Sequence, residues 1–290
     1  MEAAFPDIRS LASSKSPDVV LAAEFKDIVH VLDLNSQSCI ATLATDFDFG
    51  GKRIALSNDA QTIYCAAYQR NGVSAYSLAD GKLIWNRRDL KKCQVIRSLD
   101  NDTGLWCAFD DGPLQLLDRE SGLTIQKIRG VREIWESRYG PLSLLERGKH
   151  IELRESDKGR SIKFPLETFA LLSVVFAPGF VILSQAGGAT RCLCLNTASE
   201  VWRREETGTH CLQLGYSEAD QTVLSIWWNF ERGGDHRFIA LDIATGQEKA
   251  SVTIKGATAF AFCRDGQLLV CSNGDVIDTG TGNTDFTFKQ

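Results

Sequence analysis

The sequence lacks the motifs of several specialised protein classes. It contains no C-x-x-C pair, no H-E-x-x-H pair, no G-x-S-x-G elbow and no P-loop, so common signatures of zinc sites, serine hydrolases and nucleotide-binding proteins are missing. Its longest apolar segment, 169–180, is interrupted by Ser173, Pro178 and Gly179, whereas a membrane-spanning helix needs about 20 apolar residues. We therefore expect no membrane partner and no familiar catalytic motif.

The sequence also lacks a surplus of basic residues. Lys and Arg number 32 against 37 Asp and Glu, which gives a net charge of −5. Because nucleic-acid binding needs excess Lys and Arg to neutralise phosphates, we expect no nucleic-acid partner. The first residues, MEAAFPDIRS, do not combine a basic segment with an apolar core, so we expect no secretory signal.

Cysteine, in contrast, is abundant. The nine cysteines are an odd number and lie mostly in alternating hydrophobic segments, which indicates buried free thiols in a reducing compartment. Cys192 and Cys194 share one face of a strand, but no second Cys pair or His pair follows them, so we do not expect a zinc site. These features predict a cytoplasmic protein without a metal or a cofactor.

One local pattern recurs along the whole chain. A short β-type run ends on an apolar residue, a turn rich in Asp, Asn, Ser, Thr or Gly follows, and a second β-type run completes the unit. Successive copies lie roughly 40 residues apart, which is the period of a four-stranded propeller blade. The apolar residues before the seven turns are Leu32, Tyr76, Leu117, Leu153, Leu193, Leu241 and Ile277.

The repeat predicts an all-β fold, a seven-bladed β-propeller with four antiparallel strands per blade, filling 1–290 as a single domain. If the first strand of each blade is innermost, the chain starts inside blade 1 and ends outside blade 7, so the ring should close by packing without a shared sheet. A pair of β-sandwiches is the competing fold, but it would not explain repeats at one spacing. The blades are expected at approximately 5–43, 51–88, 93–128, 131–164, 169–205, 210–254 and 257–289.

The turn motif resembles the repeat of quinoprotein-like propellers, in which an apolar-x-Leu-Asp segment is followed by Thr-Gly and then Trp. The best copies are 240–246, 78–85 and 195–202. The resemblance implies that Asp and Thr bond the hairpin backbone, that Gly supplies a positive φ, and that Trp packs between blades. The repeats are also WD-repeat-like but lack the Trp-Asp dipeptide. Enzymatic quinoproteins are exported and hold a quinone and calcium, and no such pocket is recognisable here, so the resemblance implies the fold and not the activity.

Three loops depart from the simple turn pattern, and all three belong to the face that carries the connections between blades. The first connection places two Phe residues between carboxylates, the second is a basic run, and the extended hairpin of blade 6 combines aromatics with Arg. Aromatic and Arg side chains on loops are typical of interface hot spots. The predicted partner-binding residues are Phe47, Phe49, Arg88, Trp228, Phe230, Arg232 and His236.

Each loop also has a purely structural interpretation. Phe47 and Phe49 would plug the blade interface, and the basic run around Arg88 would be a solvated face. Adjacent residues of a strand point to opposite faces, so Trp227 and Trp228 would pack against different neighbours.

The predicted function is a non-enzymatic, protein-binding scaffold that presents this loop face to another protein. One alternative is an antitoxin-like or immunity protein that neutralises a toxin or effector, because a net charge of −5 suits a basic partner. The other alternative is an enzyme, a lyase or hydrolase, with a site in the central channel. Carboxylates, His and Arg converging at the channel mouth would favour the enzyme, and an exposed apolar patch would favour the binding module.

Overall fold

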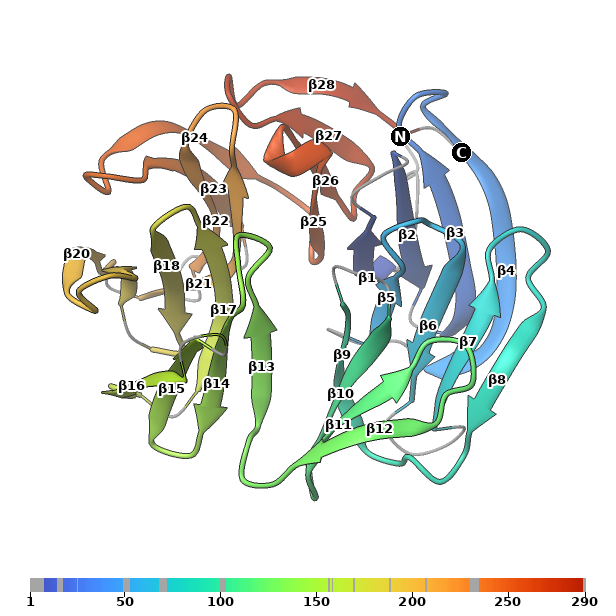
Figure 1. Ribbon diagram of the computed structural model, residues 1–290. Helices are drawn as coiled ribbons and strands as arrows, with labels where there is room; N and C mark the ends of the chain where they lie inside the picture. The colour runs from blue at the N-terminus through green and yellow to red at the C-terminus, as the bar shows by residue number, and fades with distance from the viewer. Residues whose placement is uncertain are drawn as a thin grey trace.

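The computed structural model describes residues 8–14, 18–24, 26–48, 53–67, 72–99, 103–155, 157, 159–168, 170–187, 189–206, 208–229 and 235–288, without the side chains of 24, 26, 27 and 46–48. Its strands form seven antiparallel sheets of four strands each, and every sheet consists of four consecutive strands. The sheets stand as blades around a central axis (Figure 1). The predicted seven-bladed propeller is therefore confirmed.

The first strand of each blade is innermost, because these seven strands line the central channel. They are β1 (Ile8–Ser13), β5 (Ile54–Leu56), β9 (Cys93–Ser98), β13 (Glu133–Glu136), β17 (Leu171–Ala177), β21 (Thr209–Ser217) and β25 (Phe260–Cys263). The second strands are β2 (Val19–Glu24), β6 (Thr62–Ala66), β10 (Gly104–Phe109), β14 (Leu142–Arg147), β18 (Phe180–Gln185), β22 (Thr222–Asn229) and β26 (Leu268–Cys271).

The third and fourth strands complete each blade outward. The third strands are β3 (Lys26–Asp33), β7 (Val73–Ser77), β11 (Leu114–Asp118), β15 (His150–Glu155), β19 (Thr190–Cys194), β23 (His236–Asp242) and β27 (Asp275–Asp278). The outermost strands are β4 (Ser38–Asp48), β8 (Leu83–Arg87), β12 (Thr124–Ile128), β16 (Arg160–Pro165), β20 (Glu200–Arg204), β24 (Glu248–Ile254) and β28 (Thr284–Thr287). A short 3₁₀ turn, η1 (Arg264–Gly266), joins β25 to β26.

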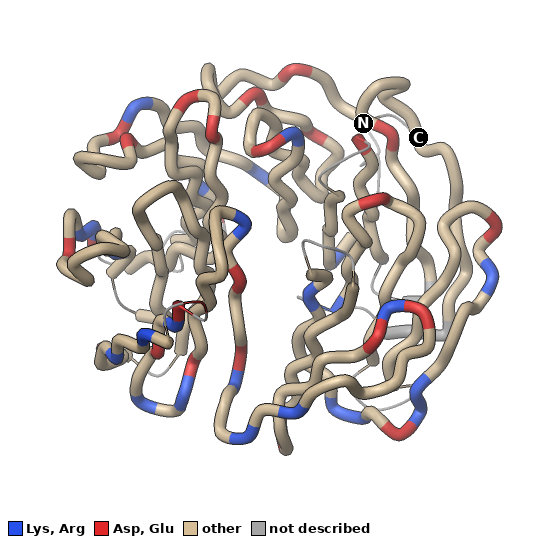
Figure 2. The backbone as a smooth tube through the Cα atoms, viewed as in Figure 1, with Lys and Arg blue, Asp and Glu red and all other residues tan. Residues whose placement is uncertain are grey.

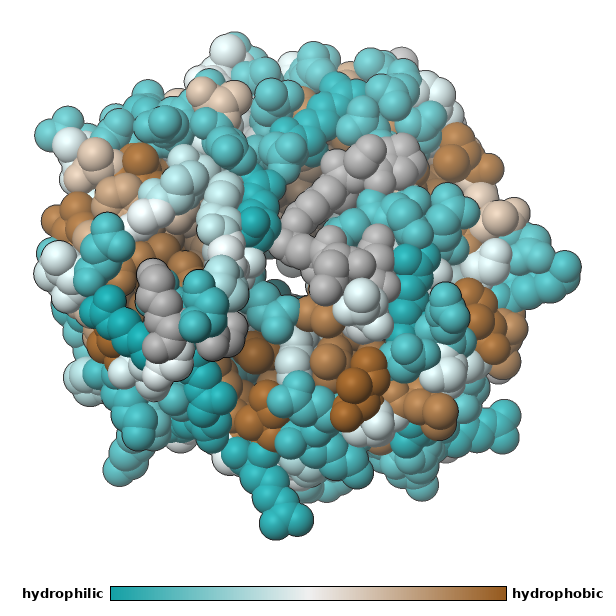
Figure 3. Space-filling model, viewed as in Figure 1, coloured by the Kyte–Doolittle hydropathy of each residue, from teal (hydrophilic) through white to brown (hydrophobic). Residues whose placement is uncertain are grey.

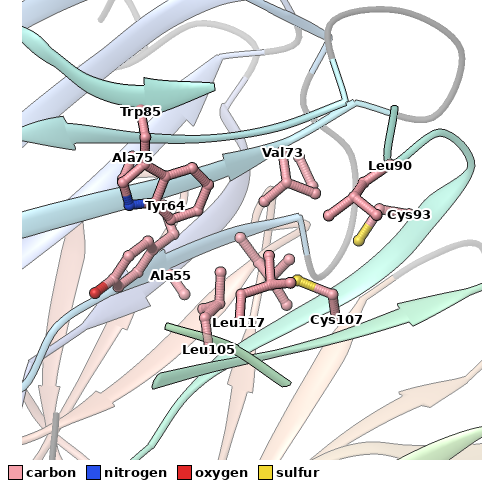
Figure 4. Close-up of a cluster of buried hydrophobic side chains, with 12 residues drawn as sticks. Ala55, Tyr64, Val73, Ala75, Trp85, Leu90, Cys93, Leu105, Cys107 and Leu117 are labelled. Atoms are coloured by element: carbon pink, nitrogen blue, oxygen red, sulfur yellow. The ribbon is translucent and has the colours of Figure 1, made fainter. Parts of the chain in front are cut away.

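The core is divided among the blade interfaces, because each blade buries both faces of its sheet against its neighbours. One hydrophobic cluster fills each of the seven interfaces. Between blades 2 and 3, Tyr64 and Trp85 from one blade pack near Leu105 and Leu117 from the next (Figure 4). This division explains why the strands contain apolar residues on both faces.

The hairpin between the third and outermost strands has the hydrogen bonds, the positive φ and the Trp packing that the resemblance implied. In blade 6, the Asp242 carboxylate accepts bonds from the Thr245 backbone and hydroxyl, both at 3.0 Å, and Gly246 has φ +70°. The Trp202 indole of blade 5 packs on this glycine and donates to the Ile243 carbonyl at 2.7 Å. A Trp therefore joins this hairpin to the blade before it.

The same arrangement recurs between blades 2 and 3. Gly122 has φ +67°, and a Cβ there would lie 2.7 Å from the Trp85 ring. The Trp85 indole donates to the Arg119 carbonyl at 2.8 Å. The predicted packing of these tryptophans between neighbouring blades is confirmed.

The outermost strands share a second repeated feature, a β-bulge near their start. In every blade except blade 4, the outermost strand contains one residue near its start that has no partner on the third strand. In blade 4 the two strands pair without a register shift. A bulge leaves its extra residue outside the regular ladder. The skipped residues are Ile40, Ile84, Ile125, Val201, Lys249 and Asp285.

The ring closes without a shared sheet, as expected from the strand order: β1–β4 and β25–β28 form separate sheets. Buried side chains that include Phe288 fill the interface between blades 7 and 1. The Arg264 side chain of η1 donates to Asp18 at 3.0 Å and to Asn35 at 2.9 Å, both in blade 1. Side-chain contacts therefore hold together the two blades that the chain does not connect.

Candidate functional site

The structure describes only part of the loop face predicted from the sequence. Phe49, Phe230 and Arg232 lie outside the described residues. The backbone of Phe47 belongs to the end of β4, which runs five residues beyond the predicted end of blade 1 at Leu43. The side chain of Phe47 also lies outside the described part of the chain.

Three predicted residues of the loop face are described. Arg88 is exposed, next to the ion pair that Arg87 and Asp89 form at 2.7 Å. Trp228 and His236 pair directly across β22 and β23. The structure therefore brings Trp228 and His236 together on blade 6, whereas Arg88 belongs to the connection between blades 2 and 3.

The loop end of blade 6 is aromatic. Trp228 is half-buried with its ring centroid 6.4 Å from that of His210, a residue that the sequence analysis did not select. The His210 Nδ1 atom accepts a bond from the Gly187 backbone at 2.9 Å. His236 is buried against Phe260 at a ring distance of 4.8 Å, and burial lowers its pKa. Neutral His236 is therefore favoured, and among the described residues of this loop end the half-buried Trp228 offers aromatic surface to a partner.

A larger apolar surface lies on the outer rim of blades 1 to 3. We call it the outer belt, and its side chains are Ile40 (55% exposed), Leu83 (53%), Ile84 (46%), Leu123 (65%) and Ile125 (57%). Brown, apolar surface appears at the right-hand margin of the ring, over β4 and β8 (Figure 3). Exposed apolar patches of this kind mark interaction sites on soluble proteins.

Interblade contacts lie close in sequence to the belt residues. Leu43 on β4 packs on Gly81, in the hairpin that leads to Leu83. Trp85, next to Ile84 on β8, packs on Gly122 in the following hairpin. The exposed side chains of the three blades therefore lie within a few residues of the contacts that hold neighbouring blades together.

The fold does not require aliphatic residues in this belt. Blades 6 and 7 place Lys249 and Asp285 at the bulge position that Ile84 and Ile125 occupy in blades 2 and 3. Both charged residues are exposed. Since a charge is accommodated in the same local geometry, the exposed isoleucines are not explained by the needs of the hairpin.

The central channel is the third candidate region, with a cavity of about 490 Å³. On the face opposite the predicted loop face, Arg138 of blade 4 reaches Asp265 of blade 7 at 2.5 Å and Glu218 of blade 6 at 3.3 Å. Both positive and negative residues occur around the whole ring in Figure 2. Arg and carboxylate side chains therefore meet at this channel mouth as mutual ion pairs.

Within the channel, Arg97 of β9 donates through Nε to the Glu133 carboxylate of blade 4 at 3.1 Å. Its guanidinium lies 5.0 Å from the centroid of the Trp135 ring. Among the described residues, no group of three His, Cys, Asp or Glu side chains could hold a metal ion.

Sequence reasoning missed both the belt and the Arg138 bridge. The adjacent apolar residues Leu83 and Ile84 break the alternation expected of a strand with one solvated face, and this was the available signal for the belt. Contacts between blades 4 and 7 depend on ring geometry, so no local pattern could indicate Arg138.

Comparisons with known proteins do not assign the chain to a family. No family model matches it, and no curated protein matches it. In the described part of the chain, no helix is long and apolar enough to cross a membrane. The fold and its surfaces therefore carry the functional argument.

Proposed function

We propose that this propeller is a protein-binding module that docks a partner on the outer belt of blades 1 to 3. The observation that carries the proposal is the exposure of five aliphatic side chains, by 46–65% each, on three consecutive blades. Burying the exposed halves of these side chains would contribute roughly 4–7 kcal/mol before the cost of association. Since association itself costs about 4–15 kcal/mol, the basic flanks and the rest of the interface must supply further binding energy.

The proposed partner is a protein segment with an apolar face and basic flanks. The aliphatic side chains of the belt call for an apolar face, and the net charge of −5 favours encounter with a basic partner. A basic toxin or effector would meet this description, and its capture would assign the immunity role.

The predicted loop face is the second candidate docking surface. It is supported by the half-buried Trp228 beside His210 at the loop end of blade 6. Aromatic side chains that are half exposed often anchor interfaces. Because the loop face and the outer rim are different surfaces, the two candidates predict different contact maps.

Photo-crosslinking in the native host separates the two surfaces. A photoreactive amino acid replaces Ile84 in the belt, Val201 at the matched bulge of blade 5, or Arg88 on the loop face. A crosslink to a protein at position 84 and not at 201 supports the belt, and mass spectrometry identifies the partner. A crosslink only at 88 would move the docking surface to the loop face, and none at any position would contradict a binding module.

We also propose a cytoplasmic location. All nine cysteines are free thiols, and seven of them are buried, which suits a reducing compartment. The Asp-Thr-Gly hairpins and the interblade tryptophans support kinship with quinoprotein-like or WD-repeat-like propellers as a scaffold.

A further inference from the structure

Two tryptophans that line the central channel differ in their hydrogen bonding from three other tryptophans. The indole N–H groups of Trp85, Trp202 and Trp227 each donate a hydrogen bond, at 2.7–2.9 Å, to another group of the chain. The indole nitrogens of Trp106 and Trp135 are buried and find no acceptor among the described residues. Buried indole N–H groups normally find a partner, so the acceptor for these two is a group that the described residues do not include, such as a ligand or a water molecule.

Blades 3 and 4 contribute the two tryptophans to the cavity lining, and each ring also packs in a different interblade cluster. Trp106 and Trp135 are 6% and 5% exposed, and both line the channel. Arg97 connects them, because it pairs directly with Trp106 across β9 and β10 and lies over the Trp135 ring. Ser98, the next residue on β9, adds a buried hydroxyl that also lacks a partner in the described part of the chain.

The available groups of this part of the cavity lining are mainly donors. An indole N–H can only donate. Arg97 uses Nε and one Nη2 hydrogen on Glu133, which leaves its Nη1 amino group available. A ligand that fits must therefore supply acceptors, and a carboxylate is a planar acceptor-only group that matches a guanidinium.

The charge of the channel limits the ligand further. The charged lining residues are Arg97, Arg138, Arg264, Glu136 and Asp265. With Glu133 beside Arg97, the arginines and the carboxylates balance, so net charge gives an anion no extra attraction, and the single charge of a carboxylate costs less to bury than the two of a phosphate. The volume of about 490 Å³ lies in the range of small-molecule pockets.

We propose that the cavity lining at Arg97, Trp106 and Trp135 binds a small monocarboxylate inside the channel. The two indole N–H groups and the Arg97 Nη1 group donate to the carboxylate oxygens. This site is independent of the outer belt, so either proposal can fail alone.

The test uses ¹⁹F NMR of 4-fluorobenzoate with the full-length protein, with 4-fluorobenzamide as the matched neutral probe. Trp106→Phe and Trp135→Phe remove the N–H and keep an aromatic ring. Trp202→Phe is the matched control, because its indole donates to Ile243 between blades 5 and 6. Thermal melts of all three variants verify folding before binding is compared.

The proposal expects saturable binding of the benzoate, with the benzamide at least about tenfold weaker. Trp106→Phe and Trp135→Phe should each weaken benzoate binding about tenfold, and Trp202→Phe should leave it unchanged. The proposal would be overturned by amide binding as tight as that of the benzoate, by wild-type benzoate affinity in both channel variants, or by no binding to the wild-type protein up to about 20 mM. The variants are compared only after the thermal melts have verified their folding, and the wild-type titration needs no variant.

Discussion

At the scale of single residues, the contact between a Trp and the glycine of the next blade controls how closely the blades pack. Gly122 combines φ +67° with a Trp85 ring that would lie 2.7 Å from a Cβ. Gly159 in blade 4 has a similar φ of +60° but no atom within 4 Å of a Cβ. Comparing alanine substitutions at these two positions therefore separates the cost of backbone strain from the cost of the interblade contact.

Gly122→Ala should lower the free energy of unfolding by about 2–4 kcal/mol, because strain and a clash with Trp85 add. Gly159→Ala should lower it by about 1 kcal/mol, because only the strain applies. Chemical denaturation of the two variants measures both values. Equal losses would show that the contact with Trp85 does not limit blade spacing.

The Glu152 carboxylate of blade 4 provides a residue-scale test of pH dependence. Hydrogen bonding from Arg154 at 2.9 Å, together with bonds from Ser161 and Arg147, lowers the pKa of Glu152 to about 2. The unfolded chain has the ordinary pKa near 4.5. The stabilisation is therefore present above that ordinary pKa and is lost as the pH falls toward 2.

Glu152→Gln should accordingly lower the melting temperature at pH 7. It should also reduce the fall in melting temperature that the wild type shows between pH 5 and pH 2. Melting curves across that range, recorded beside those of the wild type, measure the difference. A variant that keeps the full wild-type decline would show that other carboxylates cause it.

At the scale of elements, the hairpins follow from local chemistry and the bulges do not. The Asp and Thr residues of 242–246 specify their turn from within a few residues, so the repeat and the blade number could be predicted. Whether Ile84 is paired or skipped depends on the register between two strands, which alternation alone does not specify. The exposed belt therefore escaped prediction, whereas the fold did not.

The bulge geometry predicts that a charged residue can replace Ile84 without loss of stability. Ile84→Lys should change the free energy of unfolding by less than about 0.5 kcal/mol, because blade 6 carries Lys249 at the same position. Denaturant titration measures the change, with Val201→Lys as the matched substitution on blade 5. A loss of several kcal/mol would mean that Ile84 stabilises the hairpin and is not free for a partner.

At the scale of the whole molecule, blades 7 and 1 are the only neighbours that the chain does not connect. Arg264 bridges them through Asp18 and Asn35, although it adopts φ +48°, an unfavourable value for a residue other than Gly. The ring therefore maintains local strain at its closure. Contacts of this kind depend on the closed ring, which is why no sequence pattern indicated them.

Arg264→Ala should lower the free energy of unfolding by about 1–2 kcal/mol and speed amide exchange in β1 and β25–β28. Arg119→Ala is the matched control, because Arg119 pairs with Asp59 at 2.6 Å between blades 2 and 3, which the chain connects. Hydrogen exchange with mass spectrometry resolves the two effects. Equal acceleration in β1 and β25–β28 by both variants would contradict a special role for the closure.

The claim that the belt binds a protein is tested most directly by quantitative affinity capture from the native host with three proteins in parallel. These are the wild type, the double variant Ile84→Lys with Ile125→Lys, and Val201→Lys. We predict that a partner captured stoichiometrically by the wild type and by Val201→Lys is reduced at least about tenfold with the folded double variant. Equal recovery of that partner with all three proteins would contradict the belt as the docking surface.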